Sequence, residues 1–366
     1  MTYSKILLST LTFTALTFTG CGSDSSSSNN DLQEEIPNTN NNNGSTNSNP
    51  IPTSTILSGE ISKNTTLTAN KQWLLDGKVE VASGVTLTIE AGTTIAGMEG
   101  SNAWLIVYSG AKLMANGTQN NPIIFTSQEA INGDAESAGQ WGGVTIIGNK
   151  ANSQTNQYEV DDVTEAGTSG ESSGSLTFVI INNTGIAIEQ DKEINGLSLF
   201  GVSNKTKIEN ITVNRSGDDG IEIWGGDVNL KTIKIDGAQD DSFDTDAGWS
   251  GTVDGLVATN GKKAGIEMSG TSVGTYKNVD ITITSSESEG GLYFKETHGG
   301  NVGGIFENVT ITYNSDAKGA VAVHGSFDEK NTKATNVVLK GSNIKVVGKK
   351  VEDEVEAKQA DVIFIK

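Results

Sequence analysis

The residues best suited to chemistry are carboxylates, and they gather in two aspartate-rich turns. The first turn reads SGDDGIEIWGG at 216–226, and the second reads AQDDSFDTDAGW at 238–249. Clustered oxygen ligands suit calcium, and two carboxyl groups flanking a glycosidic bond can hydrolyse it. Three interpretations therefore compete: a solvated acidic surface, a calcium site and a glycan-processing site. The predicted calcium ligands are Asp240, Asp241, Asp244 and Asp246, with Asp218, Asp219 and Glu222 as additional ligands.

Both turns belong to an internal repeat that must position them. Short alternating segments recur about every 22 to 30 residues, and a second series of turn residues advances beside them. The leucine and helix signature of leucine-rich repeats is missing, so we predict an all-β, right-handed parallel β-helix over residues 55–347. The apolar series is Ile221, Phe243, Ile266, Leu292 and Val321, and the turn series is Asn210, Thr232, Gly255, Asn278, Asn308 and Asn336. The turn asparagines are expected to be structural, because asparagine tolerates left-handed backbone conformations.

Alternation along each strand predicts which side chains face outward. With Ile221, Ile223 and Phe243 in the core, successive coils about 4.8 Å apart stack the intervening residues into exposed columns. A row of like charges at that spacing is unusual for a surface that serves only solubility. We therefore predict a ligand-contacting face that includes Glu222, Trp224, Glu267 and Tyr293. The first predicted column is Ser198, Glu222, Asp244, Glu267, Tyr293 and Ala322; the second is Phe200, Trp224, Asp246, Ser269, Lys295 and His324.

The overall composition limits the classes of partner. The chain has 366 residues with a net charge of −20, which argues against nucleic acid and anionic membrane surfaces. Gly is 44 residues and Pro only 4, a balance that suits a strand solenoid because proline removes a ladder donor. One cysteine and two histidines argue against an internal disulfide and a cysteine or histidine metal site.

The N-terminal segment predicts export and anchoring. An apolar run within residues 1–20 ends in FTGC, which resembles the processing box of bacterial lipoproteins with Cys21 as the acylated residue. Gly22, rather than aspartate, follows the cysteine, and by the enterobacterial sorting rule this implies the outer membrane. Residues 21–54 are rich in Ser and Asn, which predicts a disordered tether.

Two resemblances extend these expectations. The stretches GVTLTIEAGTTIAG and SGAKLMANGTQNNPIIFTS resemble a broad group of bacterial cell-surface β-helix lipoproteins of the pectin lyase-like fold. The element GDDGI at 217–221 resembles that of pectin-hydrolysing polygalacturonases, which implies general-acid and water-activating roles for Asp218 and Asp219. In FKETHGG, Lys295 stands at that family's lysine position. The family's Asn-Thr-Asp element and its histidine are absent, and Tyr293 occupies its arginine position.

The leading functional hypothesis is a lipid-anchored surface protein that binds a glycan or another surface ligand and is stabilised by calcium. The first alternative is a polysaccharide hydrolase or lyase, with catalytic candidates Asp218, Asp219, Asp244 and Lys295. The second alternative is a structural envelope protein without a ligand site. The polar run at 151–174 predicts a projecting loop, and residues 348–366 predict a C-terminal cap that covers the open end of the solenoid.

Overall fold

The structure is a computed structural model that describes residues 54–150, 170–189, 192–295, 302–313, 321–328, 330–340 and 345–350. All of these belong to the compact unit Pro50–Lys366. The predicted signal peptide, nearly all of the tether, most of the projecting loop and residues 351–366 of the predicted cap lie outside the described residues. Within the described part, no helix is long and apolar enough to cross a membrane.

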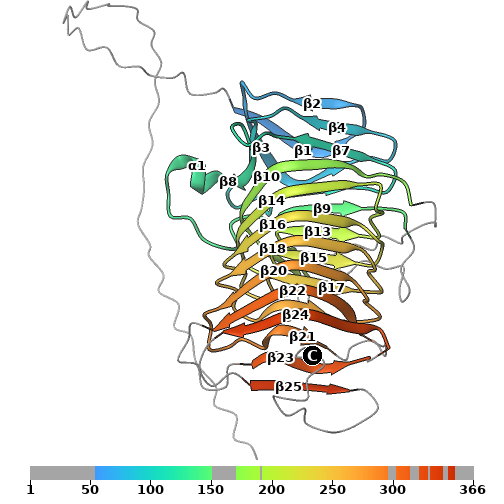
Figure 1. The fold of residues 1–366 in the computed structure, drawn as a ribbon. Helices are drawn as coiled ribbons and strands as arrows, with labels where there is room; N and C mark the ends of the chain where they lie inside the picture. Colours follow the sequence, from blue (N-terminus) through green and yellow to red (C-terminus); the bar gives the residue numbers. More distant parts are fainter. Residues whose placement is uncertain are drawn as a thin grey trace, which may run out of the picture. The chain divides into compact units, whose positions relative to one another are not determined.

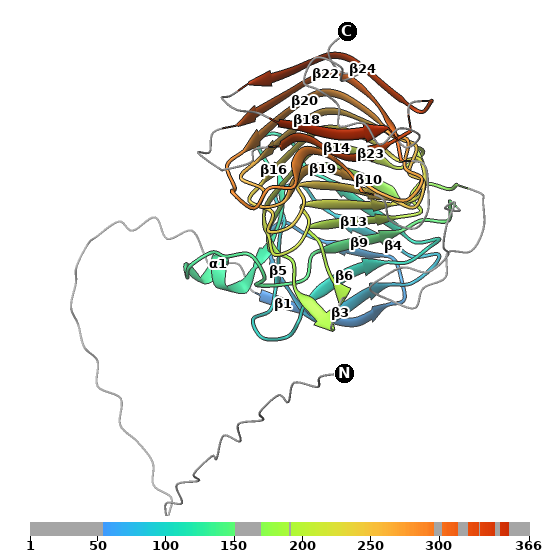
Figure 2. The same ribbon diagram turned by 90° about the horizontal axis from the view of Figure 1, so that it is seen from below.

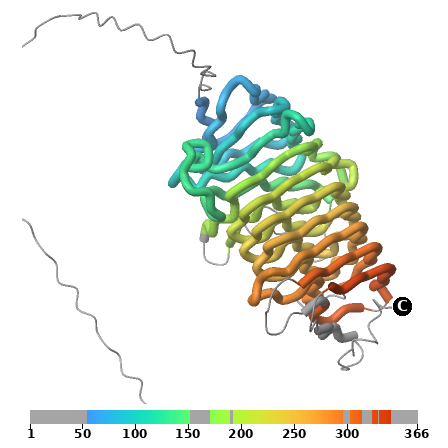
Figure 3. Tube along the Cα trace, turned by 60° about the vertical axis from the view of Figure 1, so that its left-hand side comes forward, coloured from blue at the N-terminus to red at the C-terminus, as the bar shows by residue number. Residues whose placement is uncertain are grey.

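The fold is a parallel β-helix, as the repeat predicts. Successive coils add parallel strands to one 23-stranded sheet, and Figures 1 and 3 show the chain advancing coil by coil from its N-terminal to its C-terminal strands. One set of strands forms a side that we call the short-strand face. Its members are β6 (Trp104–Val107), β9 (Val144–Ile147), β13 (Leu197–Phe200), β15 (Ile221–Trp224), β17 (Phe243–Asp246), β19 (Ala264–Met268), β21 (Gly290–Phe294), β23 (Val321–Phe327) and β25 (Lys345–Lys350).

The remaining strands wrap the other sides of the coil, as the view in Figure 2 shows. The first coils use β1 (Ser54–Ile61), β2 (Thr65–Leu67), β3 (Gln72–Val81), β4 (Thr86–Ile89), β5 (Thr94–Gly97), β7 (Lys112–Asn116) and β8 (Ile123–Ser127), with the short helix α1 (Gln128–Asn132) after β8. Later coils use long strands: β10 (Gly174–Thr184), β14 (Lys207–Ser216), β16 (Asn229–Asp236), β18 (Thr252–Thr259), β20 (Thr275–Ile283), β22 (Gly304–Tyr313) and β24 (Thr332–Lys340).

Each long strand contains at least one residue with a left-handed backbone conformation. These residues include Asn210, Asn278 and Asn308, with φ of 56°, 52° and 58°. Asparagine tolerates this conformation better than most residues. The side chains also stack: Asn308 Nδ2 donates to Asn278 Oδ1 at 3.2 Å, and Asn336 Nδ2 donates to Asn308 Oδ1 at 2.8 Å. The turn asparagines are structural, as expected.

The inward side chains form one continuous apolar core. Ile221, Ile223, Phe243 and Ile266 are fully buried in it, as the alternation predicts. Large aromatic rings fill the later coils, and the rings of Tyr276 and Phe306 stack with centroids 5.0 Å apart. This packing fixes the register of the short strands, because a one-residue slip would turn every core side chain outward.

The coil that contains β23 differs from the predicted alignment by two residues. Val323, rather than Val321, pairs with Leu292, so His324 lies beside Tyr293 where Ala322 was predicted. A two-residue shift keeps every side chain on its original side of the sheet. The apolar pattern therefore cannot distinguish the two alignments, and the prediction was wrong at this coil.

Candidate functional site

The predicted acidic column exists on the outer side of the short-strand face. Strand pairing places Glu222 beside Asp244 and Asp244 beside Glu267, followed by Tyr293. The exposure of this column was predicted wrongly. Glu222 is 6% exposed and Glu267 only 2%, so these carboxyl groups face away from the core and are nevertheless covered.

The turns just before the short strands carry a second stack, which the sequence analysis missed. The Asn195 side-chain oxygen accepts the backbone N–H of Asp219 at 3.0 Å, and Asp219 Oδ1 accepts that of Asp241 at 2.8 Å. Asp241 Oδ1 in turn accepts the backbone N–H of Ala264. Each of these side chains therefore ties its coil to the next one, and this bonding fixes the direction in which the carboxyl groups point. Asn195 occupies the equivalent turn one coil before Asp219, a position that aligning the repeats could have found.

A diagonal contact connects the turn stack to the acidic column. In the turn before β13, Asn195 Nδ2 donates to Glu222 Oε2 at 2.7 Å. In a later coil, the same relation brings the carboxyl group of Asp241 against that of Glu267. An amide can donate to a carboxylate, whereas two ionised carboxylates can only accept. The Asp241–Glu267 contact is therefore a hydrogen bond only when one of the two carries a proton.

Burial and like charge raise the pKa values throughout this cluster. Burial, the charge of Glu267 and the contact with Glu267 hold the pKa of Asp241 well above its usual value. Burial and the charges of Asp241 and Glu222 do the same for the pKa of Asp244. Burial and the charge of Asp244 raise the pKa of Glu267 to about 7, although its contacts with Asp241 and Lys295 oppose the shift.

Lys295 supplies a positive charge to this cluster. Its Nζ lies 2.8 Å from Glu267 Oε1, and its side chain is 43% exposed. Among the described residues, Glu267 Oε2 and Asp244 Oδ1 are buried without a hydrogen-bond partner. The pKa of Lys295 is raised, chiefly by its hydrogen bond and charge interaction with Glu267, against the effect of burial.

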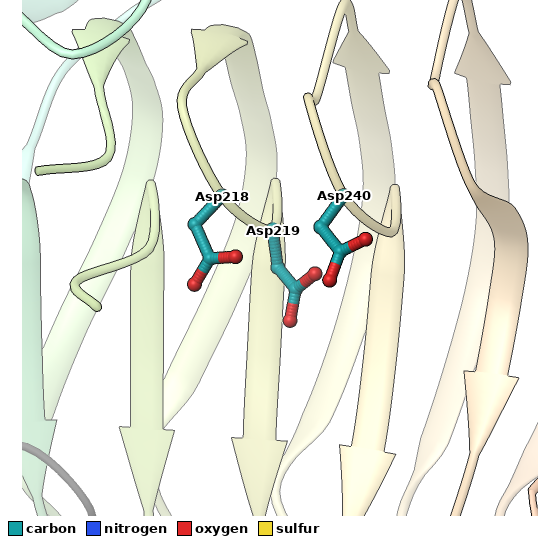
Figure 4. Close-up of side chains that lie close together, drawn as sticks. All are labelled: Asp218, Asp219 and Asp240. Carbon is teal, nitrogen blue, oxygen red and sulfur yellow. The ribbon is translucent and has the colours of Figure 1, made fainter. Parts of the chain in front are cut away.

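The described carboxylates form two groups that could hold a metal ion. Asp218, Asp219 and Asp240 form one group (Figure 4), and Asp241, Glu267 and Glu289 form the other. Within each group, one oxygen from each residue lies within 4.8 Å of the others. The structure thus places the predicted ligands Asp240 and Asp241 in different groups.

The remaining predicted calcium ligands, Asp244, Asp246 and Glu222, join neither group of described residues. Asp246 is buried, and its carboxylate accepts the backbone N–H of Ala247. Glu289 enters the second group although the sequence analysis did not select it. Glu289 stands just before β21 in a turn. The alternation of side chains along strands does not predict how the residues of such a turn line up with those of the neighbouring coils.

Half-buried aromatic side chains lie on the first and last strands of this acidic face, Trp224 on β15 and Tyr293 on β21. Trp224 packs on an outer apolar cluster formed by Trp104, Ile106, Ile147, Ile194 and Phe200, and this cluster is separate from the main core. The predicted outward direction of Trp224 is therefore correct. At the other end, the Tyr293 ring stacks on His324, with centroids 4.8 Å apart and planes 10° apart.

Another outward column of the same molecule provides an internal comparison. On the long strands, in-register pairing aligns Glu209, Lys231, Asp254, Lys277 and Glu307. The signs alternate, and Lys277 Nζ lies 3.0 Å from Glu307 Oε2. This is the pattern expected of a solvated, self-neutralising surface. The run Glu222, Asp244 and Glu267 breaks it with three acids in succession.

These features define a parallel β-helix with an acidic, aromatic-bounded face. Residues 59–365 match the family described as pectate-lyase like beta helix domain, and the chain belongs to this family. Among solved structures, it is similar to the enzymatically active domain of tailspike protein 2 from bacteriophage CBA120. That match has 13% identity and a TM-score of 0.34, and covers 75% of this chain and 43% of that chain.

The full-length tailspike protein 2 from an Escherichia coli O157:H7 bacteriophage is also similar. Its identity is 12% and its TM-score 0.27, with coverage of 76% of this chain and 38% of that chain. The chain therefore spans less than half the length of either tailspike chain. No match was found among curated protein sequences.

Proposed function

We propose that the chain is a surface protein that binds a glycan on the short-strand face between Trp224 and Tyr293. The observation that carries this proposal is the acidic column, in which Asp244 Oδ1 is buried without a hydrogen-bond partner among the described residues. A column that served only solubility would alternate in sign, as the column from Glu209 to Glu307 does. A buried polar atom without a hydrogen-bond partner lowers the stability of the fold. Such an atom calls for an explanation, and one explanation is that a bound ligand supplies the missing hydrogen bond.

The chemistry of this face suits sugars. Aromatic rings pack on the apolar faces of pyranose rings, and carboxylates accept hydrogen bonds from hydroxyl groups. Rigid strands hold these groups in place, which lowers the entropic cost of binding. The net charge of −20 disfavours direct binding of a strongly anionic polymer. A neutral glycan, or a uronate held through a cation, is therefore the favoured ligand class.

Tyr293→Ala is expected to weaken glycan binding at least about tenfold, the equivalent of about 1.4 kcal/mol. The ring is half-buried, so its loss removes ligand contact with little effect on the core. A polysaccharide array identifies the glycan and titration calorimetry measures the affinity, with Val257→Ala on the exposed surface of β18 as the matched control. If wild type and Tyr293→Ala bind the glycan with equal affinity, Tyr293 is not part of the site. If the protein binds no glycan on the array, the proposal is rejected.

Glycan hydrolysis is a second candidate, favoured by the pKa of Glu267. A carboxyl group with a pKa of about 7 is about half protonated at neutral pH, and the protonated form could serve as a general acid. Product release from the array glycans distinguishes hydrolysis from binding alone. A lyase that used Lys295 as its base is disfavoured, because its raised pKa keeps the ammonium protonated.

We further propose that this face holds a calcium ion. The group Asp218, Asp219 and Asp240 is the favoured site, because the other group already has the Lys295 ammonium 2.8 Å from Glu267. Three carboxylates provide the oxygen ligands that calcium prefers, and water would complete its coordination.

Millimolar calcium is expected to raise the melting temperature relative to a chelator. Binding to the folded state alone adds about 2.7 kcal/mol at one hundred times the dissociation constant. Asp218→Asn should remove most of this shift, whereas Asp280→Asn, an exposed residue on β20, should retain it. Identical melting curves with calcium and with chelator would reject the site.

Anchoring is the remaining part of the proposal. The apolar run that ends at Cys21, followed by a Ser- and Asn-rich tether, supports a lipid-bearing N-terminus at the bacterial outer membrane. The tether would give the β-helix distance from the bilayer, so the short-strand face could reach a surface polysaccharide.

A further inference from the structure

We infer that the site takes the end of a glycan chain rather than its middle, because a hairpin closes one end of the acidic face. This inference rests on the proposed glycan-binding function. The hairpin consists of β11 (Ala187–Glu189) and β12 (Lys192–Glu193), which pair antiparallel. It branches from the coil between β10 and β13.

The hairpin is fastened to the outer side of the short-strand face. Its base is closed by the N–H of Ile194, which donates to the carbonyl of Ile186 at 3.0 Å. Ile194 is fully buried in the outer apolar cluster together with Phe200, and Ile188 packs against that cluster. Lifting the hairpin would expose these apolar surfaces to water, so it remains in place.

The chemistry of the outward side chains changes where the hairpin ends. Ile147, Phe200, Trp224 and Asp246 follow one another in register from β9 to β17. Ile147 and Phe200 are covered completely, and Trp224 is half-buried at the margin. Beyond Trp224 the next residue of this column is the carboxylate Asp246, and the acids Asp244 and Glu267 follow in the neighbouring column. Trp224 and the hairpin therefore form a wall at which the polar face stops.

The size of the face follows from the coil spacing. Three coil steps separate β15 from β21, so Trp224 and Tyr293 lie at levels about 14 Å apart along the helix axis. One coil step is close to the length of one sugar residue in an extended chain. A chain lying along the column would place about three sugar residues between the two aromatic side chains. A longer chain can extend past Tyr293, but it meets the hairpin at Trp224.

The decisive measurement is the dependence of affinity on ligand length. Titration calorimetry would use cello-, manno- and chito-oligosaccharides from disaccharide to hexasaccharide with the full mature chain. In the series that binds, we expect the dissociation constant to fall up to the tri- or tetrasaccharide and then to change by less than about twofold. Limited cleavage of the parent polymer should increase the binding capacity in proportion to the number of chain ends.

A dissociation constant that keeps falling to the hexasaccharide, with capacity independent of chain ends, would overturn this inference while leaving glycan binding intact. Absence of binding in all three series would overturn it together with the proposed function.

Ile188→Asp, which loosens the hairpin, should move the plateau to longer oligosaccharides. Ala187→Asp is the matched control, because Ala187 is the exposed neighbour on the same strand. If Ile188→Asp fails to fold, the wild-type length series still decides the question.

Discussion

Cys21→Ser is expected to abolish acylation completely and to remove the protein from the lipid-anchored membrane fraction. Wild-type protein should begin at Cys21 and carry the added mass of acyl chains. The variant should carry no acyl mass, whichever N-terminus it has. Intact-mass spectrometry of both proteins, after extraction with detergent, is the direct measurement. Gly22→Ala is the matched control, because it leaves the thiol in place.

The size of this effect follows from the way lipid chains hold proteins on bilayers. Each buried methylene contributes about 0.8 kcal/mol, and stable anchoring requires more than one chain or a second signal. With a net charge of −20, the rest of the chain offers no electrostatic attraction to an anionic surface. The lipid would therefore carry the whole attachment. A wild-type chain without acyl mass that retains residues before Cys21 would contradict the prediction.

The fold could be predicted from sequence because a solenoid repeats one local pattern. Ile221, Phe243 and Ile266 recur at the same place in successive coils, and each is fully buried in the core. The limit of this reasoning appears at β23, where Val323 rather than Val321 pairs with Leu292. A shift of two residues preserves the inward and outward alternation, so only the packing of neighbouring coils selects the register.

The candidate site was predicted less completely, because its geometry depends on turns. Residue type identified Asp219 and Asp241 as candidates, but not their bonds to the backbone N–H groups of the next coil. These bonds direct Asp241 towards Glu267, where burial and the neighbouring negative charges raise the pKa values of both groups. Strand alternation also placed Glu267 correctly on the outer side. It could not show that the side chain is covered there, since burial depends on segments distant in sequence.

Lys295→Met is expected to destabilise the fold in a manner that depends on pH. The substitution keeps much of the side-chain volume and removes the ammonium that lies 2.8 Å from the buried Glu267 carboxylate. Breaking a fully buried ion pair costs about 3–5 kcal/mol. Because the Lys295 side chain is 43% exposed, solvent screening reduces the expected loss to about 1–2 kcal/mol at pH 8. Urea unfolding in chelator measures this loss without any contribution from bound metal.

The direction of the pH dependence follows from the pKa of Glu267. Its pKa in the folded protein is raised from 4.5 to about 7, so the folded state binds more protons than the unfolded state between these values. Its contribution to stability is therefore greatest below about pH 4.5 and declines as the pH rises through about 7. Without Lys295 the carboxylate loses its nearest positive charge, which raises its pKa further. At pH 5 Glu267 is mostly protonated in both proteins, so the two free energies of unfolding should differ little.

The difference between wild type and Lys295→Met should therefore grow from pH 5 to pH 8. Lys262→Met is the matched control, because Lys262 pairs with Glu287 at 3.3 Å where both side chains are exposed. Its cost should be below about 0.5 kcal/mol at either pH. An equal loss for Lys295→Met at both pH values would mean that Lys295 stabilises the fold by packing rather than by its charge. The buried carboxyl groups would then be neutralised by protonation and not by Lys295. The Lys295 ammonium would be available to contact a ligand.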